Sequence, residues 1–162
     1  NGTIRGAEFA YQQFYDFLPG WLSGLGFQFN YTYVDSSVSN PFATAGSDIP
    51  AMVPLEKLSK HSYNAVALYE KGRYTARLAW SWRGEYLDTT QGSGANGIPQ
   101  YQKPYASLDA SVSYNVNDHV ALSFDAVNLN NRMNEVYIGT ASAPLRYELN
   151  DRRYGFSARI TY

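Results

Sequence analysis

The sequence predicts an all-β fold: a segment of an antiparallel transmembrane β-barrel, built from about seven membrane-spanning strands that end at Tyr162. Three observations predict it. Apolar and polar residues alternate at every second position in several stretches of about ten residues. Short and long connections alternate between those stretches. No window reaches the roughly 18 to 20 apolar residues of a transmembrane helix, because charged or amide side chains recur in each one.

The composition is polar on average but rich in large amphipathic rings. Aromatic residues make up 16% of the 162 residues and include 15 Tyr, while the mean hydropathy is -0.40. A lipid-facing barrel tolerates this balance because only one face of each strand must be apolar. The absence of cysteine excludes disulfides and thiolate-bound zinc or iron–sulfur clusters. The net charge of -1 gives no electrostatic footprint for nucleic acid, so no nucleic-acid partner is expected.

The first two expected strands cover residues 3–14 and 25–34. The first alternates weakly, with Ala7, Phe9 and Tyr11 on one face and Glu8 and Gln12 on the other. The second shows the strongest alternation in the chain. Its apolar positions are Leu25, Phe27, Phe29, Tyr31 and Tyr33, and its polar or small positions are Gly26, Gln28, Asn30 and Thr32. This period of two is typical of a strand with two different environments.

The next two strands, residues 63–70 and 74–83, are expected to form a hairpin. We place its two-residue turn at Lys71-Gly72, which sets Tyr69 opposite Tyr74 as a cross-strand pair. Along residues 74–83, apolar side chains alternate with two guanidinium groups and hydroxyl groups. Such a polar face suits a water-filled lumen and would be costly against lipid.

The last three strands are expected at residues 107–114, 120–128 and about 152–162. Leu108, Ala110, Val112 and Tyr114 alternate with serine and aspartate, and an Asn117-Asp118 turn leads into the next strand. The final strand places Tyr154, Phe156, Ala158, Ile160 and Tyr162 at every second position. A terminal aromatic ring at that place is expected to lie at a membrane interface.

The connections fix the direction of the strands. Short ones lie at residues 16–24, 71–72 and 117–118, and long polar ones lie at about 36–59, 84–104 and 131–150. Because outer-membrane barrels have short periplasmic turns and long extracellular loops, the last strand is expected to end at the periplasmic rim. The long connections are expected to be irregular loops, and the run at residues 92–97 is expected to be a flexible loop tip.

The alternation assigns a side to each charged or aromatic residue of the strands. The lumen-facing candidates are Arg77, Arg83, Asp109, Asp125 and Arg159, which could line a substrate path or pair across neighbouring strands. The rings expected in the external aromatic girdle are Tyr31, Tyr33, Trp80 and Trp82.

Candidate substrate-binding residues lie in the long connections, where side chains need not face lipid. They are Phe42, Asp48, Tyr86, Asp88, Gln91, Asn96, Tyr101, Asn134 and Tyr137. His61 and His119 fall at opposite ends of the strands, so no shared metal site is expected, and the sequence implies no cofactor. No serine, histidine and acid set converges in this arrangement, so we do not expect an enzyme.

Several stretches resemble the carboxy-terminal part of TonB-dependent receptors, in particular the proteobacterial branch often associated with carbohydrate uptake. The matching stretches are GTIRGAEFAYQQF (2–14), LPG (18–20), LSGLG (22–26), NYTYVDS (30–36), LSKHSYN (58–64), LYEKG (68–72), ARLAW (76–80) and AVNLNN (126–131). The resemblance covers nearly the whole chain outside the loops.

This resemblance implies a twenty-two-stranded barrel in the bacterial outer membrane of a Gram-negative organism, of which residues 1–162 would be the last third. The plug domain, the earlier strands and the amino-terminal segment that contacts TonB have no counterpart here. The implied function is import of a bulky nutrient, an oligosaccharide in this branch. The implied partners are outer-membrane lipid, the remaining strands and plug, TonB, and the barrel assembly machinery, which would recognise the terminal signature Tyr154, Phe156, Ala158, Ile160 and Tyr162.

Three alternatives stay open at this point. An iron-chelate importer would have the same architecture, and only the branch resemblance separates it from an oligosaccharide importer. A passive porin or structural barrel would lack a plug. A soluble carbohydrate-binding sandwich would be found in the aqueous phase without detergent.

Overall fold

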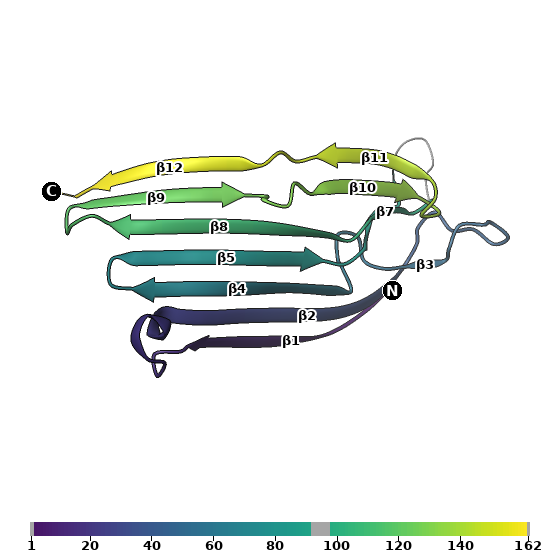
Figure 1. Ribbon diagram of the computed structural model, residues 1–162. Helices are drawn as coiled ribbons and strands as arrows, with labels where there is room; N and C mark the ends of the chain where they lie inside the picture. The colour runs from purple at the N-terminus through teal and green to yellow at the C-terminus, as the bar shows by residue number, and fades with distance from the viewer. Residues whose placement is uncertain (1, 92–97, 162) are drawn as a thin grey trace.

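The computed structural model describes residues 2–91 and 98–161, and most of the strands form one antiparallel main sheet (Figure 1). The strand order is β1-β2-β4-β5-β8-β9-β12, with β3 paired to β2 beside this path. The bounds are β1 Gly2–Phe14, β2 Leu25–Ser39, β3 Met52–Val53, β4 His61–Lys71, β5 Tyr74–Arg83, β8 Tyr105–Asn115, β9 Val120–Val127 and β12 Arg153–Ile160. The prediction of an all-β antiparallel segment with about seven strands is confirmed.

The pairing register sorts the side chains of the main sheet into two faces. Directly paired residues share a face, so the pairs Phe29–Ala65, Ala65–Trp80 and Trp80–Leu108 carry one face across four strands. We call this the aromatic face, and its rings touch from strand to strand. Ring centroids are 6.2 Å apart for Phe29 and Tyr63, and 5.3 Å apart for Tyr63 and Trp82. The opposite side, which carries the amide, hydroxyl and charged side chains, is the polar face.

The turn of the β4–β5 hairpin differs from the prediction. Lys71 pairs with Tyr74, so Gly72 and Arg73 form the turn, and Tyr69 lies opposite Ala76 instead of Tyr74. Gly72 takes a φ of +59°, which a glycine adopts without a side-chain clash. The two registers differ by two residues and keep the same side chains on each face, so the period of two could not distinguish them. The ring opposite Tyr74 is Tyr114 of β8, with centroids 4.8 Å apart.

The strand ends define two rims. At the turn end, the 3-10 helix η1 Gly20–Gly24 packs beside the β4–β5 turn, and the Lys71 ammonium donates to the Ser23 hydroxyl over 2.6 Å and to the Gly20 carbonyl. Asn117 closes the β8–β9 turn, because its side-chain oxygen accepts from the backbone N–H groups of His119 and Val120. The described part of the chain contains no helix long and apolar enough to span a membrane. β1 and β12 form the two edges of the main sheet.

At the opposite rim, the loop end, the structure corrects the prediction of irregular long loops. Four strands form a separate small sheet in the order β11-β10-β7-β6, which continues beyond the main sheet (Figure 1). Their bounds are β6 Tyr86–Thr89, β7 Gln100–Gln102, β10 Met133–Ile138 and β11 Pro144–Leu149. These strands are short, and their ladders shift register between Leu87 and Thr89 and between Val136 and Tyr137. The side chains of Leu87 and Val136 are fully buried within it. The predicted flexible tip at residues 92–97 lies outside the described residues.

Candidate ligand-binding site

The polar face of the main sheet continues onto the small sheet at Arg83 and Tyr86. The guanidinium carbon of Arg83 lies 4.1 Å from the centroid of the Tyr86 ring. Tyr86 pairs with Gln102, Gln102 pairs with Val136, and Val136 pairs with Arg146, so these four residues share one side of the small sheet. We call this side the polar shelf.

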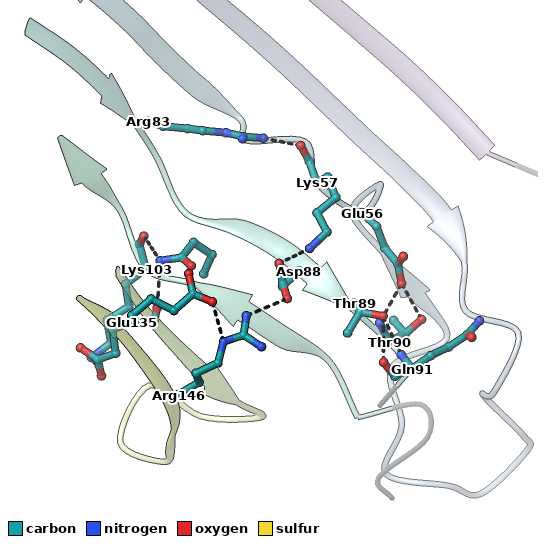
Figure 2. Close-up of polar contacts among 12 residues, drawn as sticks. Glu56, Lys57, Arg83, Asp88, Thr89, Thr90, Gln91, Lys103, Glu135 and Arg146 are labelled. Atoms are coloured by element: carbon teal, nitrogen blue, oxygen red, sulfur yellow. Dashed lines mark hydrogen bonds and ion pairs between the residues drawn. The ribbon is translucent and has the colours of Figure 1, made fainter. Parts of the chain in front are cut away.

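An ion-pair cluster crosses the polar shelf from its first strand to its last (Figure 2). The carboxylate of Asp88 binds the Lys57 ammonium and lies 3.8 Å from a guanidinium nitrogen of Arg146. Arg146 in turn donates to Glu148 over 2.8 Å. The Asp88 side chain is only 12% exposed, whereas those of Lys57 and Arg146 are more than half exposed. The nearly buried Asp88 carboxylate therefore binds two cations whose side chains reach solvent.

The segment that carries Lys57 docks along the edge of β6. The Lys57 N–H donates to the Leu87 carbonyl over 2.7 Å. The Glu56 carboxylate accepts from the N–H and hydroxyl of Thr90 over 2.7 and 2.9 Å (Figure 2). Arg83 fixes the same segment, because it donates to the Ser59 hydroxyl over 2.8 Å and to the Lys57 carbonyl. The edge of the small sheet is thereby covered, which removes a site for unwanted strand pairing.

The polar shelf also carries buried amides. Gln100 and Gln102 lie on the same side of β7, on either side of Tyr101 in the sequence, and are 4% and 3% exposed. Gln102 donates to the Glu135 carbonyl over 3.1 Å. The Gln100 amide nitrogen and the Asn134 amide oxygen are buried, and neither has a hydrogen-bond partner among the described residues. The polar shelf therefore contains one donor and one acceptor that are both unpaired and shielded from the surface.

Phenol rings occupy the other side of the small sheet, which continues from the aromatic face. Tyr101 and Tyr137 stack with ring centroids 5.4 Å apart. Burial raises the pKa of Tyr101, and burial together with a hydrogen bond to Glu85 raises the pKa of Tyr137. Both phenols therefore remain protonated at neutral pH and can act as neutral donors. Lys103, directly after β7, and Glu135 of β10 form an ion pair of 2.7 Å.

The structure brings together some of the candidate substrate-binding residues and separates others. Tyr86, Asp88 and Asn134 contribute to the polar shelf, whereas Tyr101 and Tyr137 lie on the opposite side. Gln91 follows β6, where its N–H bonds the Thr89 hydroxyl over 2.9 Å. Phe42 and Asp48 belong to the separate segment between β2 and β3. Asn96 lies outside the described residues.

Sequence reasoning missed five residues of the polar shelf: Lys57, Gln100, Gln102, Arg146 and Glu148. The sequence did contain a signal, because Gln100 and Gln102, like Arg146 and Glu148, stand two positions apart in β-compatible segments. Lys57 carries no such signal, since it reaches Asp88 only through the fold of its loop.

The five residues predicted to face the lumen share the polar face by register. Arg77 pairs with Ser111, and Ser111 pairs with Asp125. Asp125 pairs with Gly155, which shares a face with Arg159 because the two stand four positions apart on β12. Asp109 accepts from the Asn128 N–H over 2.8 Å and from the Ser107 hydroxyl over 3.1 Å. The ion pairs found among the described residues do not include Arg77, Arg83, Asp109, Asp125 or Arg159. Whether these residues line a substrate path stays a prediction.

The two histidines lie at opposite rims. His61 bonds the Tyr31 hydroxyl over 2.7 Å at the loop end, and His119 bonds the Thr161 carbonyl over 3.1 Å at the turn end. On β12, Tyr154, Phe156 and Ile160 are between 60% and 72% exposed. Tyr162 lies outside the described residues, and the assembly role of this set stays a prediction.

Comparison with known proteins gives one family. A family model described as "TonB dependent receptor-like, beta-barrel" matches residues 1–131. Searches of curated proteins and of solved structures returned no match. The family match spans β1 to β9, and therefore includes the main sheet except for β12.

Proposed function

This chain belongs to the TonB-dependent receptor family, and on that premise we propose that it forms the carboxy-terminal part of the wall of a barrel that imports an oligosaccharide. The family match carries the coarser function, which is transport across the outer membrane with lipid and TonB as partners. The proposal adds the orientation of the wall, the surface that meets the ligand and the class of ligand.

The orientation follows from the two rims and the two faces. The loop end would face the cell exterior and the turn end the periplasm, because external loops of outer-membrane barrels are the long ones. The aromatic face would meet lipid. Its side chains are widely exposed along the strands, with Phe9 at 57%, Leu78 at 47% and Phe124 at 47% exposed. Such a large apolar surface needs an apolar environment.

The polar shelf is the surface that we assign to the ligand. It extends the polar face beyond the loop end, where a molecule that enters the lumen from outside would first meet the wall. Its cations Lys57, Arg83 and Arg146 are matched by the carboxylates of Glu56, Asp88 and Glu148, so the shelf carries no excess charge to attract an anion. A neutral ligand with many hydroxyl groups fits this balance.

The buried amides support a sugar ligand in particular. The Gln100 donor and the Asn134 acceptor are buried without a described partner, and a side-chain rotation that brings either to the surface would let it pair with a sugar hydroxyl group, which both donates and accepts. Tyr86 adds an aromatic ring on which the apolar C–H side of a pyranose could pack. Few, well-placed polar groups beside an aromatic surface are typical of small-molecule sites.

Binding to the intact purified protein in detergent tests the proposal. Isothermal titration with maltohexaose, xylohexaose and N-acetylchitohexaose should show binding of at least one of them, and ferrichrome should show none. Asn134→Leu, which removes an unpaired buried acceptor without changing the size greatly, should weaken sugar binding by about 1 to 2 kcal/mol. Ser142→Ala, in the exposed turn between β10 and β11, is the matched control. Binding of ferrichrome without any sugar would favour the iron-chelate alternative and contradict the proposal.

A further inference from the structure

A cavity opens at the loop end where β2 leaves β4. Their pairing ends at Tyr33 and His61, while β2 continues beside β1 as far as Val38. Beyond this point, residues 54–60 and residues 84–85, which link β5 to β6, line the space between β2 and β4. The cavity is open to the surface and has a volume of about 400 Å³, within the range of small-molecule sites.

Aromatic rings form much of the cavity lining. His61 and Trp82 come from the aromatic face of the main sheet, and Tyr101 comes from the corresponding side of the small sheet. Leu58 and Pro104 add aliphatic surface. The rings are held in place by their own contacts, because Trp82 stacks on Tyr63 and Tyr101 stacks on Tyr137. A ligand would therefore meet a preformed aromatic surface.

The polar groups of the cavity favour a neutral ligand. The Lys60 ammonium and the Asp35 carboxylate pair over 2.8 Å, and both side chains are 55% exposed. Glu85 adds a second carboxylate to the lining. One cation against two anions would repel a phosphate group, whereas the paired ammonium and carboxylate can together donate to and accept from a hydroxyl group.

From this combination we propose that the cavity binds one residue of a neutral saccharide. The apolar side of a pyranose ring would pack on Trp82 or Tyr101, and its hydroxyl groups would bond Lys60 and Asp35. The cavity is a second site that shares only the Tyr86 ring with the polar shelf, because its other rings, His61, Trp82 and Tyr101, come from the aromatic face and its continuation. Two sources offer this chemistry: the sugar core of a glycolipid in the outer leaflet, and the nutrient oligosaccharide. Only the second source rests on the proposed function.

Saturation-transfer NMR on the intact protein in detergent micelles tests the inference. The probes are maltohexaose, N-acetylchitohexaose and a neutral, delipidated outer-core oligosaccharide of lipopolysaccharide. Leu58→Trp fills the cavity and should lower the affinity for the bound probe at least about tenfold, which corresponds to ~1.4 kcal/mol. Leu55→Trp, in the same segment but outside the lining, should leave the affinity unchanged. Folding of each variant is checked by its heat-dependent migration in gels.

A second variant tests the polar contacts without filling the cavity. Lys60→Met keeps the side-chain length and should lower the affinity about threefold to tenfold, as expected for one lost hydrogen bond. Preference for the core oligosaccharide would identify the glycolipid as the source, and preference for either of the other probes would identify the nutrient. Both results support the site. The inference is overturned if no probe binds, or if a folded Leu58→Trp protein binds as well as the unchanged protein.

The outcome is separable from that of the transport proposal. Asn134→Leu alters the polar shelf and should leave the saturation-transfer signal of the cavity unchanged. If that variant abolishes the signal while Leu58→Trp retains it, the saccharide binds at the shelf and the cavity inference is wrong. If Leu58→Trp abolishes the signal but Asn134→Leu leaves oligosaccharide titration unchanged, the cavity inference holds and the shelf proposal fails.

Discussion

The main sheet and the small sheet are both antiparallel, but they use side-chain pattern in different ways. Along the long strands of the main sheet, most rings lie on one face and most polar groups on the other, as for Trp80 and Ser81. The small sheet has amides and the ion pairs of Asp88 on one side, Tyr101, Tyr137 and the Lys103–Glu135 ion pair on the other, and only a small buried core. The comparison teaches that a strict period of two along a whole strand reflects two unlike environments, whereas short strands that bury single side chains such as Leu87 and Val136 need only local pairing.

The strongest test of the small sheet removes its core. Leu87→Ala should destabilise the small sheet by about 2 to 5 kcal/mol, because the Leu87 side chain is fully buried. Hydrogen exchange should then rise in β6, β7 and β10 while β4 and β5 stay protected. Leu145→Ala, at a position that is 38% exposed on β11, is the control and should have a much smaller effect. Equal loss of protection in the main sheet would show that the two sheets unfold as one unit.

An arginine on each face tests the main sheet. Leu78→Arg should lower the free energy of unfolding in lipid by about 2 to 4 kcal/mol, because Leu78 lies in the middle of β5 on the aromatic face. Ser81→Arg places the same charge on the polar face and should cost far less. Equilibrium unfolding of both variants in lipid vesicles measures the difference. Equal costs would mean that the assignment of the faces is wrong.

These two experiments address what the sequence could and could not predict. Positions such as Phe27 and Phe29 repeat one environment along a whole strand, so alternation located the strand and its face. The small sheet joins β7 to β10 across about thirty residues of chain, and its strands carry register shifts, so neither length nor alternation marked it. The contact of Lys57 with Asp88 depends on a loop whose Lys57 has a φ of +62°, a conformation that the sequence does not indicate.

Removal of a charge tests how the small sheet is tied to its covering segment. Asp88→Ala should destabilise the docking of residues 54–60 by about 1 kcal/mol, because it leaves Lys57 and Arg146 without their shared anion. The effect is modest since both cations already reach solvent. Glu148→Ala, which removes a carboxylate that is 46% exposed, should cost less. Hydrogen exchange at the Lys57 N–H, which bonds Leu87, reports the docking directly, and unchanged exchange would rule out this role for Asp88.

The smallest effect on stability is expected at the chain end. Deletion of Tyr162 removes one aromatic residue and should leave refolding into detergent in vitro nearly unchanged. If the alternating residues of β12 act as a signal for the barrel assembly machinery, the same deletion should sharply lower the amount of assembled protein in cells. Quantitative blotting of outer-membrane fractions measures this, and unchanged assembly would leave only a structural role for the ring.

The central claim is that the aromatic face of the main sheet meets lipid and the polar face meets water. Single cysteines placed in turn at residues 76 to 82 of β5 can carry a spin label, since the chain has no cysteine of its own. In lipid vesicles, accessibility to oxygen should peak at Ala76, Leu78, Trp80 and Trp82, and accessibility to a water-soluble nickel complex should peak at the residues between them. Two oscillations of period two, opposite in phase, are the predicted result. Oscillations in phase, or equal access to the nickel complex on both faces, would contradict the account.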